Sequence, residues 1–290
     1  MPRIVSMISN FQKDRPAGSP SWPIVHVLVA TIVATGCLAD EPPPKESAPT
    51  NVQPATDRLS SGDAKLDAIL DRLETKGKTM KGLSCKLLYR YVMVEVVQDE
   101  QVKEGSLLFA RGEPNSRFFI HFNKLLADGV VKDTGEYWAF DGRWLVERND
   151  LTKKIIRREI AREGQREDPF KIGEGPFPLP LGQKREDILA NFKVKREDFT
   201  LGDPRNTDHL HCVPLPNTAL ADKYSRVEIY VDRALELPVR VVSERVKDGN
   251  RIEVDFRDID VRQAPDGSRF RIEEPKDFEV SIEPLTPANP

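Results

Sequence analysis

The sequence lacks the short motifs that identify most catalytic and nucleotide-binding sites. It contains no Gly-x-Ser-x-Gly, His-Glu-x-x-His, Cys-x-x-Cys or P-loop pattern, and no Gly-x-Gly-x-x-Gly follows a predicted strand. It is also poor in imidazole and thiol ligands, with 4 His and 3 Cys in 290 residues. We therefore expect a protein that is not an enzyme and that uses no metal and no cofactor.

One cluster of potential metal ligands is compatible with a metal-dependent enzyme. Asp208, His209, His211 and Cys212 lie in one short stretch. Side chains alternate along a strand, so the two histidines would share one face while Cys212 points to the other. Asp208 is the one further ligand nearby, which leaves a metal site incomplete. Two strand histidines without a metal are the expectation, and a metal-dependent hydrolase is the alternative.

An excess of basic residues is also missing. The chain has 44 Lys and Arg against 47 Asp and Glu, a formal net charge of −3. Binding to nucleic acid needs a clustered basic excess that neutralises phosphates. We therefore expect no nucleic-acid partner.

The N-terminal segment has an apolar run over residues 24–36, which is shorter than the roughly 20 residues of a membrane-spanning helix. Basic residues precede it, so residues 1–37 are predicted to be a signal peptide. Gly36 followed by Cys37 resembles the lipobox of bacterial lipoproteins, which implies lipidation of Cys37 and a membrane anchor. The alternative is cleavage after Ala39. Either outcome places the protein in the periplasm, in the first case attached to the outer membrane.

The rest of the chain divides by composition. Residues 38–60 are rich in Pro, Ser, Thr and acidic residues and have few large apolar side chains, so they are predicted to form a flexible linker. Residues 61–285 are long enough for one sizeable core, and residues 286–290 are predicted to be a disordered tail. We expect the folded part to be a monomer.

Two cysteines, Cys85 and Cys212, remain in the predicted domain. An oxidising periplasm permits a disulfide, but spacing alone does not show whether the two residues approach each other. Buried free thiols are the alternative.

A helix is predicted at the start of the domain. Leu66, Ile69, Leu70 and Leu73 follow the i, i+3, i+4, i+7 spacing, with capping oxygens just before them and Gly77 as the predicted end. One narrow apolar stripe is typical of a helix that lies on a hydrophobic surface.

About ten strands are predicted after this helix, mostly antiparallel and paired with their neighbours in sequence. Apolar and polar residues alternate from residue 83 onward, and Asp141-Gly142 and Asp248-Gly249 indicate hairpin turns. The apolar phase slips between Phe256 and Ile259, which predicts a β-bulge.

An insert interrupts the strands at residues 162–192. Prolines at alternate positions in residues 173–182 exclude a helix or a central strand, so this run is expected to lie extended over the core. A short helix is predicted over residues 184–192, with Ile188, Leu189 and Phe192 on one face.

Several segments together resemble the LolA-like carriers of outer-membrane lipoproteins. Glu104-Gly105 leads through a strand to Arg111 and Pro114, Asp141-Gly142-Arg143-Trp144 opens another strand, and residues 270–280 resemble the closing strand of that family. Two departures stand out: Gly112-Glu113 separates Arg111 from its proline, and Asp277 occupies a position where the family usually has Gly.

The resemblance implies a mainly β (α+β) fold, an incomplete antiparallel β-barrel with a lid of short helices. It implies that the protein binds lipoprotein acyl chains between barrel and lid and acts with the inner-membrane lipoprotein-release machinery. In that family the residue matching Arg111 tethers the lid. The expected acyl-contacting residues are Leu66, Leu70, Leu73, Tyr89, Tyr91, Phe118, Ile120, Phe122, Ile188 and Phe192.

Two other functions fit the same fold. A membrane-anchored acceptor of lipoproteins is favoured by Cys37 and by residues 124–129, where two leucines are expected in a protruding loop. A regulator of envelope stress is the third interpretation.

Overall fold

The computed structural model describes residues 59–94, 99–165 and 183–285. All of them belong to one compact unit of the chain, Ala55–Pro290. The predicted signal peptide, Cys37, most of the linker and the proline-rich run lie outside the described residues.

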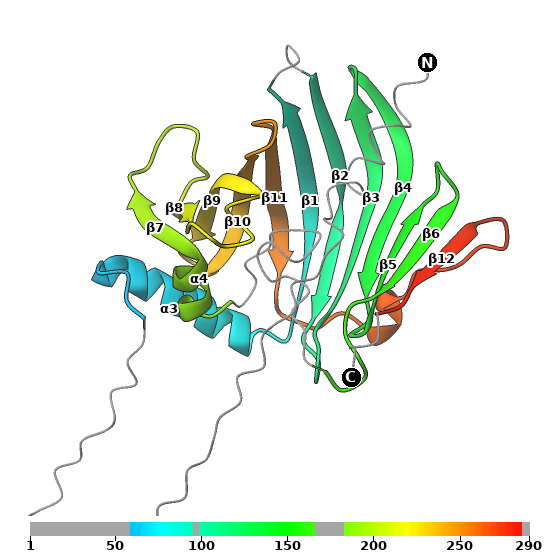
Figure 1. The fold of residues 1–290 in the computed structure, drawn as a ribbon, viewed down its shortest axis with the longest axis horizontal. Helices are drawn as coiled ribbons and strands as arrows, with labels where there is room; N and C mark the ends of the chain where they lie inside the picture. Colours follow the sequence, from blue (N-terminus) through cyan, green and yellow to red (C-terminus); the bar gives the residue numbers. More distant parts are fainter. Residues whose placement is uncertain (1–58, 95–98, 166–182, 286–290) are drawn as a thin grey trace, which may run out of the picture. The chain divides into compact units, whose positions relative to one another are not determined.

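The described strands form a single open sheet (Figure 1). Its strand order is β12-β6-β5-β4-β3-β2-β1-β11-β10-β9-β8-β7, so β1 lies in the middle and β7 and β12 are the edge strands of the described sheet. The prediction of an incomplete barrel is confirmed, with twelve strands where about ten were expected. The strands are β1 (Gly82–Met93), β2 (Asp99–Ala110), β3 (Arg117–Ala127), β4 (Val130–Phe140), β5 (Trp144–Asn149), β6 (Lys154–Glu159), β7 (Phe192–Glu197), β8 (Thr207–Pro214), β9 (Tyr224–Asp232), β10 (Leu237–Arg245), β11 (Arg251–Asp260) and β12 (Glu279–Glu283).

The predicted turns and the predicted bulge are present. Gly142 and Gly249 adopt φ values of 108° and 65°, a region that glycine enters without a Cβ clash. In the β1–β11 pair, Ser84 pairs with Asp260 and Lys86 with Arg257, so β11 has one extra residue there. This bulge lies where the apolar phase of the sequence slips.

The glycine of the Glu-Gly segment has a packing role. Gly105 lies where the β2–β3 register shifts, and a Cβ at this position would collide with the backbone carbonyl of His121. A residue without a side chain therefore allows β3 to approach β2 closely at this point.

In the described part of the chain, two α-helices and one short 3-10 helix accompany the sheet. Asp63 caps the first helix by accepting hydrogen bonds from the backbone N–H groups of Lys65 (2.8 Å) and Leu66 (3.3 Å). Gly77 does not end this helix, which continues to Thr79. The helices are α3 (Ala64–Thr79), α4 (Arg185–Asn191) and η1 (Gly267–Phe270).

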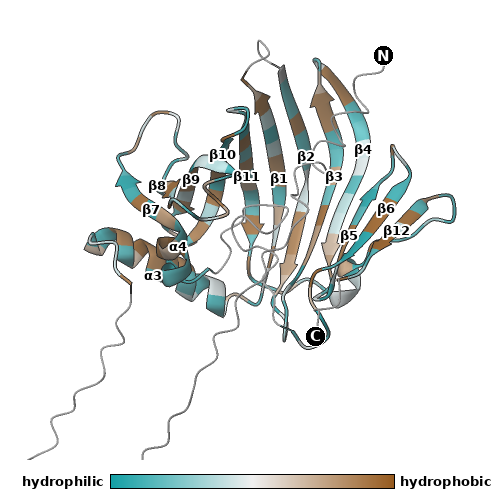
Figure 2. Cartoon of the chain, in the orientation of Figure 1, coloured by the Kyte–Doolittle hydropathy of each residue, from teal (hydrophilic) through white to brown (hydrophobic). Residues whose placement is uncertain are grey.

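One face of the sheet forms the core together with the helices. This inner face carries Leu83, Cys85 and Leu87 of β1, and α3 and α4 lie together beside the β7–β10 part of the sheet (Figure 1). Figure 2 shows apolar and polar residues alternating along the strands and around α3. The sheet is thus buried on one face, to which most of its apolar side chains point, and partly exposed on the other.

Candidate ligand-binding face and the helices beside it

The apolar stripe of α3 is buried, as its spacing predicts. Leu66, Leu70 and Leu73 belong to the same core cluster as the inner face of the sheet, together with Ile69. Polar residues cover the rest of the helix, so these side chains provide most of its apolar contact.

The second helix, α4, buries fewer apolar side chains than predicted. Ile188 is buried on α4, but the helix ends at Asn191. Phe192 is the first residue of β7, where it is also buried. The prediction that Phe192 belongs to the helix is wrong, because its backbone takes extended angles at the helix end.

Aromatic rings form a row on the inner face. The rings of Tyr89 and Phe122 meet edge-on at 5.9 Å, and Phe122 meets Trp138 in the same way at 5.7 Å. Phe118 lies 6.1 Å from Phe140. The row crosses β1, β3 and β4. These strands lie near one another because β1 pairs with β2, β2 with β3 and β3 with β4, all antiparallel.

The predicted ligand residues on the sheet differ in accessibility. Phe118, Ile120 and Phe122 are buried, whereas Tyr89 and Tyr91 are partly exposed. The pKa of the Tyr89 phenol is raised above its ordinary value, because desolvation by the surrounding side chains disfavours the phenolate. The hydroxyl of Tyr91 accepts a hydrogen bond of 2.8 Å from the side-chain amide of Asn250.

Sequence reasoning missed a charged pair on this face. The ammonium group of Lys103 lies 2.6 Å from the carboxylate of Glu136, which is buried, and 5.9 Å from the centre of the Phe122 ring. Glu136 lies at alternate positions with Trp138 and Phe140, so the sequence could have placed its side chain on the same face of β4 as theirs. The inner face thus carries a paired charge among its apolar side chains.

Arg111 contacts the C-terminal end of α3. Its Nε donates to the carbonyl oxygen of Met80 at 3.2 Å, and its Nη2 donates to the carbonyl oxygen of Gly77. The backbone N–H of Arg111 also donates to the carbonyl oxygen of Lys81 at 2.9 Å. A cation at a helix C-terminus satisfies free carbonyl groups and interacts favourably with the helix dipole.

A second polar connection joins the two helices. The backbone N–H of Arg185 donates to Glu74 at 3.1 Å, and its guanidinium donates to Asp71 at 3.0 Å. Between these two residues of α3, Arg72 pairs with Asp208 of β8. Helical spacing places Asp71 and Glu74 on neighbouring positions of α3, but their partner lies too far along the chain to be inferred.

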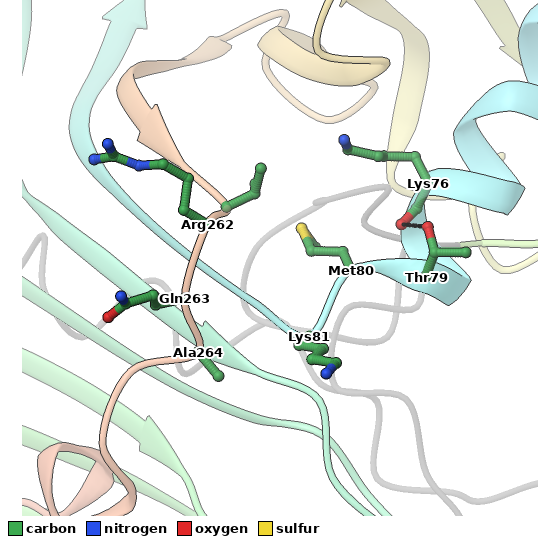
Figure 3. A pocket seen from close by; sticks show the side chains of 8 residues that line it. Lys76, Thr79, Met80, Lys81, Arg262, Gln263 and Ala264 are labelled. Carbon is green, nitrogen blue, oxygen red and sulfur yellow. Dashed lines mark hydrogen bonds between the residues drawn. The ribbon is translucent and has the colours of Figure 1, made fainter.

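A separate recess of about 510 Å³ lies between the end of α3 and the segment after β11 (Figure 3). Three cationic side chains contribute to its wall, and the guanidinium of Arg262 is already paired with Asp260. This mixed polar lining does not match the apolar contact that an acyl chain requires. The lining residues are Lys76, Thr79, Met80, Lys81, Val261, Arg262, Gln263 and Ala264.

The histidine cluster is held by hydrogen bonds. His209 and His211 contact the two oxygens of Glu228 on β9 at 3.0 and 2.7 Å. Asp208 turns away and accepts from Arg233 at 2.8 Å. Within the described residues, no group of three or more His, Cys, Asp or Glu side chains is arranged to hold a metal ion.

Both remaining cysteines are buried free thiols. Cys212 lies in the buried core, opposite the histidines as predicted, and no disulfide joins it to Cys85. Burial raises the pKa of Cys85 to about 12 and also raises the pKa of Cys212.

The protruding loop expected at residues 124–129 is instead the end of the β3–β4 hairpin. β3 continues to Ala127, and Asp128 and Gly129 form the turn with φ values of 53° and 70°. The Asp-Gly pair was the missed signal. Apolar side chains are nevertheless exposed at this tip, with Leu126 at 37%, Val130 at 51% and Val131 at 63%.

Across the described residues, no helix is both long and apolar enough to cross a membrane.

A scan against protein-family models and a search of curated proteins found no match. Solved structures that resemble the chain include an uncharacterized conserved protein from Thermus thermophilus, with 13% identity, a TM-score of 0.46, and coverage of 76% of this chain and 99% of that one. MucB of Pseudomonas aeruginosa in its complex with MucA gives 13% identity, a TM-score of 0.40, and coverage of 75% and 63%. A LolA superfamily protein from Nitrosomonas europaea gives 12% identity, a TM-score of 0.36, and coverage of 71% and 97%.

Proposed function

We propose that the protein is a lipoprotein-sorting carrier of the cell envelope that shields acyl chains between the inner face of its sheet and the helices α3 and α4. The observation that carries this proposal is the contrast between a broad aromatic inner face and helices held by narrow apolar stripes and a few polar contacts. Such helices can be replaced by a ligand that offers equivalent apolar surface.

The free energy gained by burying an acyl chain is comparable to the free energy lost when α3 leaves the sheet. Burial of a large apolar side chain contributes about 1.5–3 kcal/mol, so the four stripe residues of α3 contribute about 6–12 kcal/mol. An acyl chain of about 15 methylenes gains about 12 kcal/mol at about 0.8 kcal/mol per methylene. One acyl chain therefore matches the contact that α3 gives up when it moves.

The polar contacts fix the closed position. We propose that Arg111 tethers α3 through the carbonyl groups of Gly77 and Met80, and that Arg185 couples α4 to α3. Leu70 and Ile188 contact the acyl chain from the helices, and Tyr89 and Phe122 contact it from the sheet. We propose that the Lys103–Glu136 pair contacts the polar end of a bound amphiphile.

Binding of a fluorescent fatty acid tests this proposal. Wild-type protein should bind the probe saturably, and a diacyl lipopeptide should displace it. Leu70→Glu should change probe affinity at least tenfold, whereas Leu201→Glu is a matched control because Leu201 is fully exposed. Absence of saturable binding by folded, delipidated protein would refute the carrier function.

A second function is favoured by the exposed tip of the β3–β4 hairpin. Leu126, Val130 and Val131 form an apolar group on one tip, which suits contact with a membrane by an anchored acceptor of lipoproteins. Val131→Ser should then weaken binding of the protein to anionic vesicles while leaving the affinity for the fatty-acid probe unchanged. An unchanged vesicle affinity would favour the carrier.

A further inference from the structure

The last strand of the sheet is held unlike the other eleven. β12 pairs with β6 in parallel, whereas every other strand pair in the described residues is antiparallel. All residues of β12 are exposed. Residues 271–285, here called the C-terminal strap, follow the buried Phe270 of η1, which fixes where the strap begins.

Charge holds the strap to β6 and its preceding turn. Four cationic side chains each pair with a carboxylate of the strap, and most of these side chains are exposed. The pairs are Lys153–Asp277 at 2.6 Å, Lys154–Glu279 at 3.5 Å, Arg157–Glu274 at 3.1 Å and Arg158–Glu283 at 2.6 Å.

Arg148 of β5 adds a fifth cationic contact. Its guanidinium lies 4.9 Å from the centre of the Tyr137 ring and 5.0 Å from the centre of the Phe278 ring of the strap. It also donates to the carbonyl oxygen of Glu273 at 3.1 Å. The strap is thus recognised by cations and by backbone pairing more than by apolar burial, since Val280 and Ile282 remain 43% and 60% exposed.

We infer that the edge of β6 is a docking site for an extended acidic segment of a partner protein, and that the C-terminal strap occupies this site within the free chain. An exposed ion pair contributes only about 0.2–1 kcal/mol and is screened by salt, so the strap is held weakly. When it leaves, β6 presents unpaired backbone groups beside five cations, of which Arg148 also pairs with Asp150 and Arg158 with Glu147. A partner strand that alternates acidic or other polar residues with apolar ones, as Glu279-Val280-Ser281-Ile282-Glu283 does, fits this edge.

The site lies apart from the proposed acyl-binding contacts and does not depend on them. Its occupant is a protein strand, because the strap itself shows which backbone register and which charges the edge accepts. The strap is also tethered at Phe270, so it competes at a high effective concentration against any partner.

Hydrogen exchange of the wild-type protein gives the first test. The amides of Glu279 and Ser281, which face β6, should exchange at least tenfold faster at about 1 M than at about 0.01 M ionic strength, because the Debye length falls from about 30 Å to about 3 Å. Amides of β11 serve as the internal control and should not change. Strap amides as protected as those of β11 at both salt concentrations would overturn the inference.

A pair of proline variants gives the second test. The backbone N–H of Glu279 donates to the carbonyl oxygen of Lys153 at 2.9 Å, so the N–H of Ser281, two residues later, points toward β6 as well. Ser281→Pro removes that donor, whereas Ile282→Pro is a matched control whose N–H points away from β6.

A labelled peptide with the sequence of residues 272–285 serves as the probe for both variants. It should bind Ser281→Pro at least tenfold more tightly than the wild type or Ile282→Pro, and a peptide with Gln at the Glu positions should bind less tightly. Binding of the fatty-acid probe should be the same in all three proteins, which separates this inference from the proposed function. Equal peptide affinity in both proline variants would refute the docking site, and if Ser281→Pro fails to fold, the exchange experiment decides.

Discussion

Replacing Arg111 tests whether α3 is a movable cover. Arg111→Leu keeps much of the aliphatic volume but removes both side-chain hydrogen bonds to the carbonyl oxygens of Gly77 and Met80. A hydrogen bond to a charged group contributes about 1.5–3 kcal/mol, and these bonds are partly exposed, so we take the lower value for each. The expected loss is about 3 kcal/mol, which corresponds to a roughly 100-fold larger population of the displaced helix.

Hydrogen exchange at α3 measures this population directly. Amides of α3 should lose protection by roughly 100-fold, while amides of β3 and β4 should keep the protection of the wild type. The fatty-acid probe should associate and dissociate faster. Arg111→Lys is the matched control for charge: it keeps a cation near the helix end but cannot reach both carbonyl groups with a planar fork.

Two outcomes would refute the reasoning. Unchanged protection of α3 in Arg111→Leu would mean that the apolar stripe alone fixes the helix. A uniform loss of protection over the whole sheet would mean that Arg111 stabilises the entire fold and that α3 does not move separately.

Three further outcomes are expected. Cys37→Ala should move the protein from the membrane fraction to the soluble periplasm, since two or more acyl chains are needed for stable anchoring; wild-type protein that is already soluble would contradict lipidation. Cys85, whose pKa burial raises to about 12, and Cys212 should react slowly with a bulky alkylating reagent until the protein is unfolded, and fast labelling of the folded protein would contradict their burial. Burial alone would raise the pKa of Asp203, but the hydrogen bonds from Thr200 and the contact with His209 together outweigh burial and leave this pKa below its ordinary value. Ionised Asp203 therefore stabilises the fold above about pH 4, and this contribution is lost as pH falls through the folded-state pKa; Asp203→Asn should flatten the acid side of the stability curve, and an unchanged curve would contradict this role.

Local patterns predicted the parts of the fold that local forces determine. The spacing of Leu66, Ile69, Leu70 and Leu73 indicated the buried side of α3, because a helix of period 3.6 has one stripe to bury. The phase slip before Ile259 indicated the bulge, because alternation on a half-buried strand cannot shift without an extra residue.

The features that were missed depend on partners far apart in the sequence. Lys103 meets Glu136 because two register shifts in the β2–β3–β4 segment bring them to one point, and a single chain does not reveal such shifts. Glu228 meets two histidines through the β8–β9 register. The closing strand expected within residues 270–280 forms later, at Glu279–Glu283, and none of its residues is buried.

Helix ends were also misjudged where tertiary contacts override local preference. Gly77 suggests a helix end because glycine often follows the last turn. In the structure the helix continues for two more residues, and the carbonyl group of Gly77 accepts from Arg111. Phe192 fits the spacing of a helical stripe, yet the backbone is already extended there and begins an edge strand.

The position of α3 in the chain has a mechanical consequence. The contacts of Arg111 fix the C-terminal end of the helix, next to the start of β1, whereas the preceding chain joins the folded unit at the opposite end, near Asp63. A helix of 16 residues is about 24 Å long, so a pull on the N-terminal segment acts on α3 as on a lever whose pivot is at Gly77 and Met80. If lipidation of Cys37 anchors the chain to a membrane, tension in the segment before Asp63 would pull on the N-terminal end of α3 first, and slack would let the helix return.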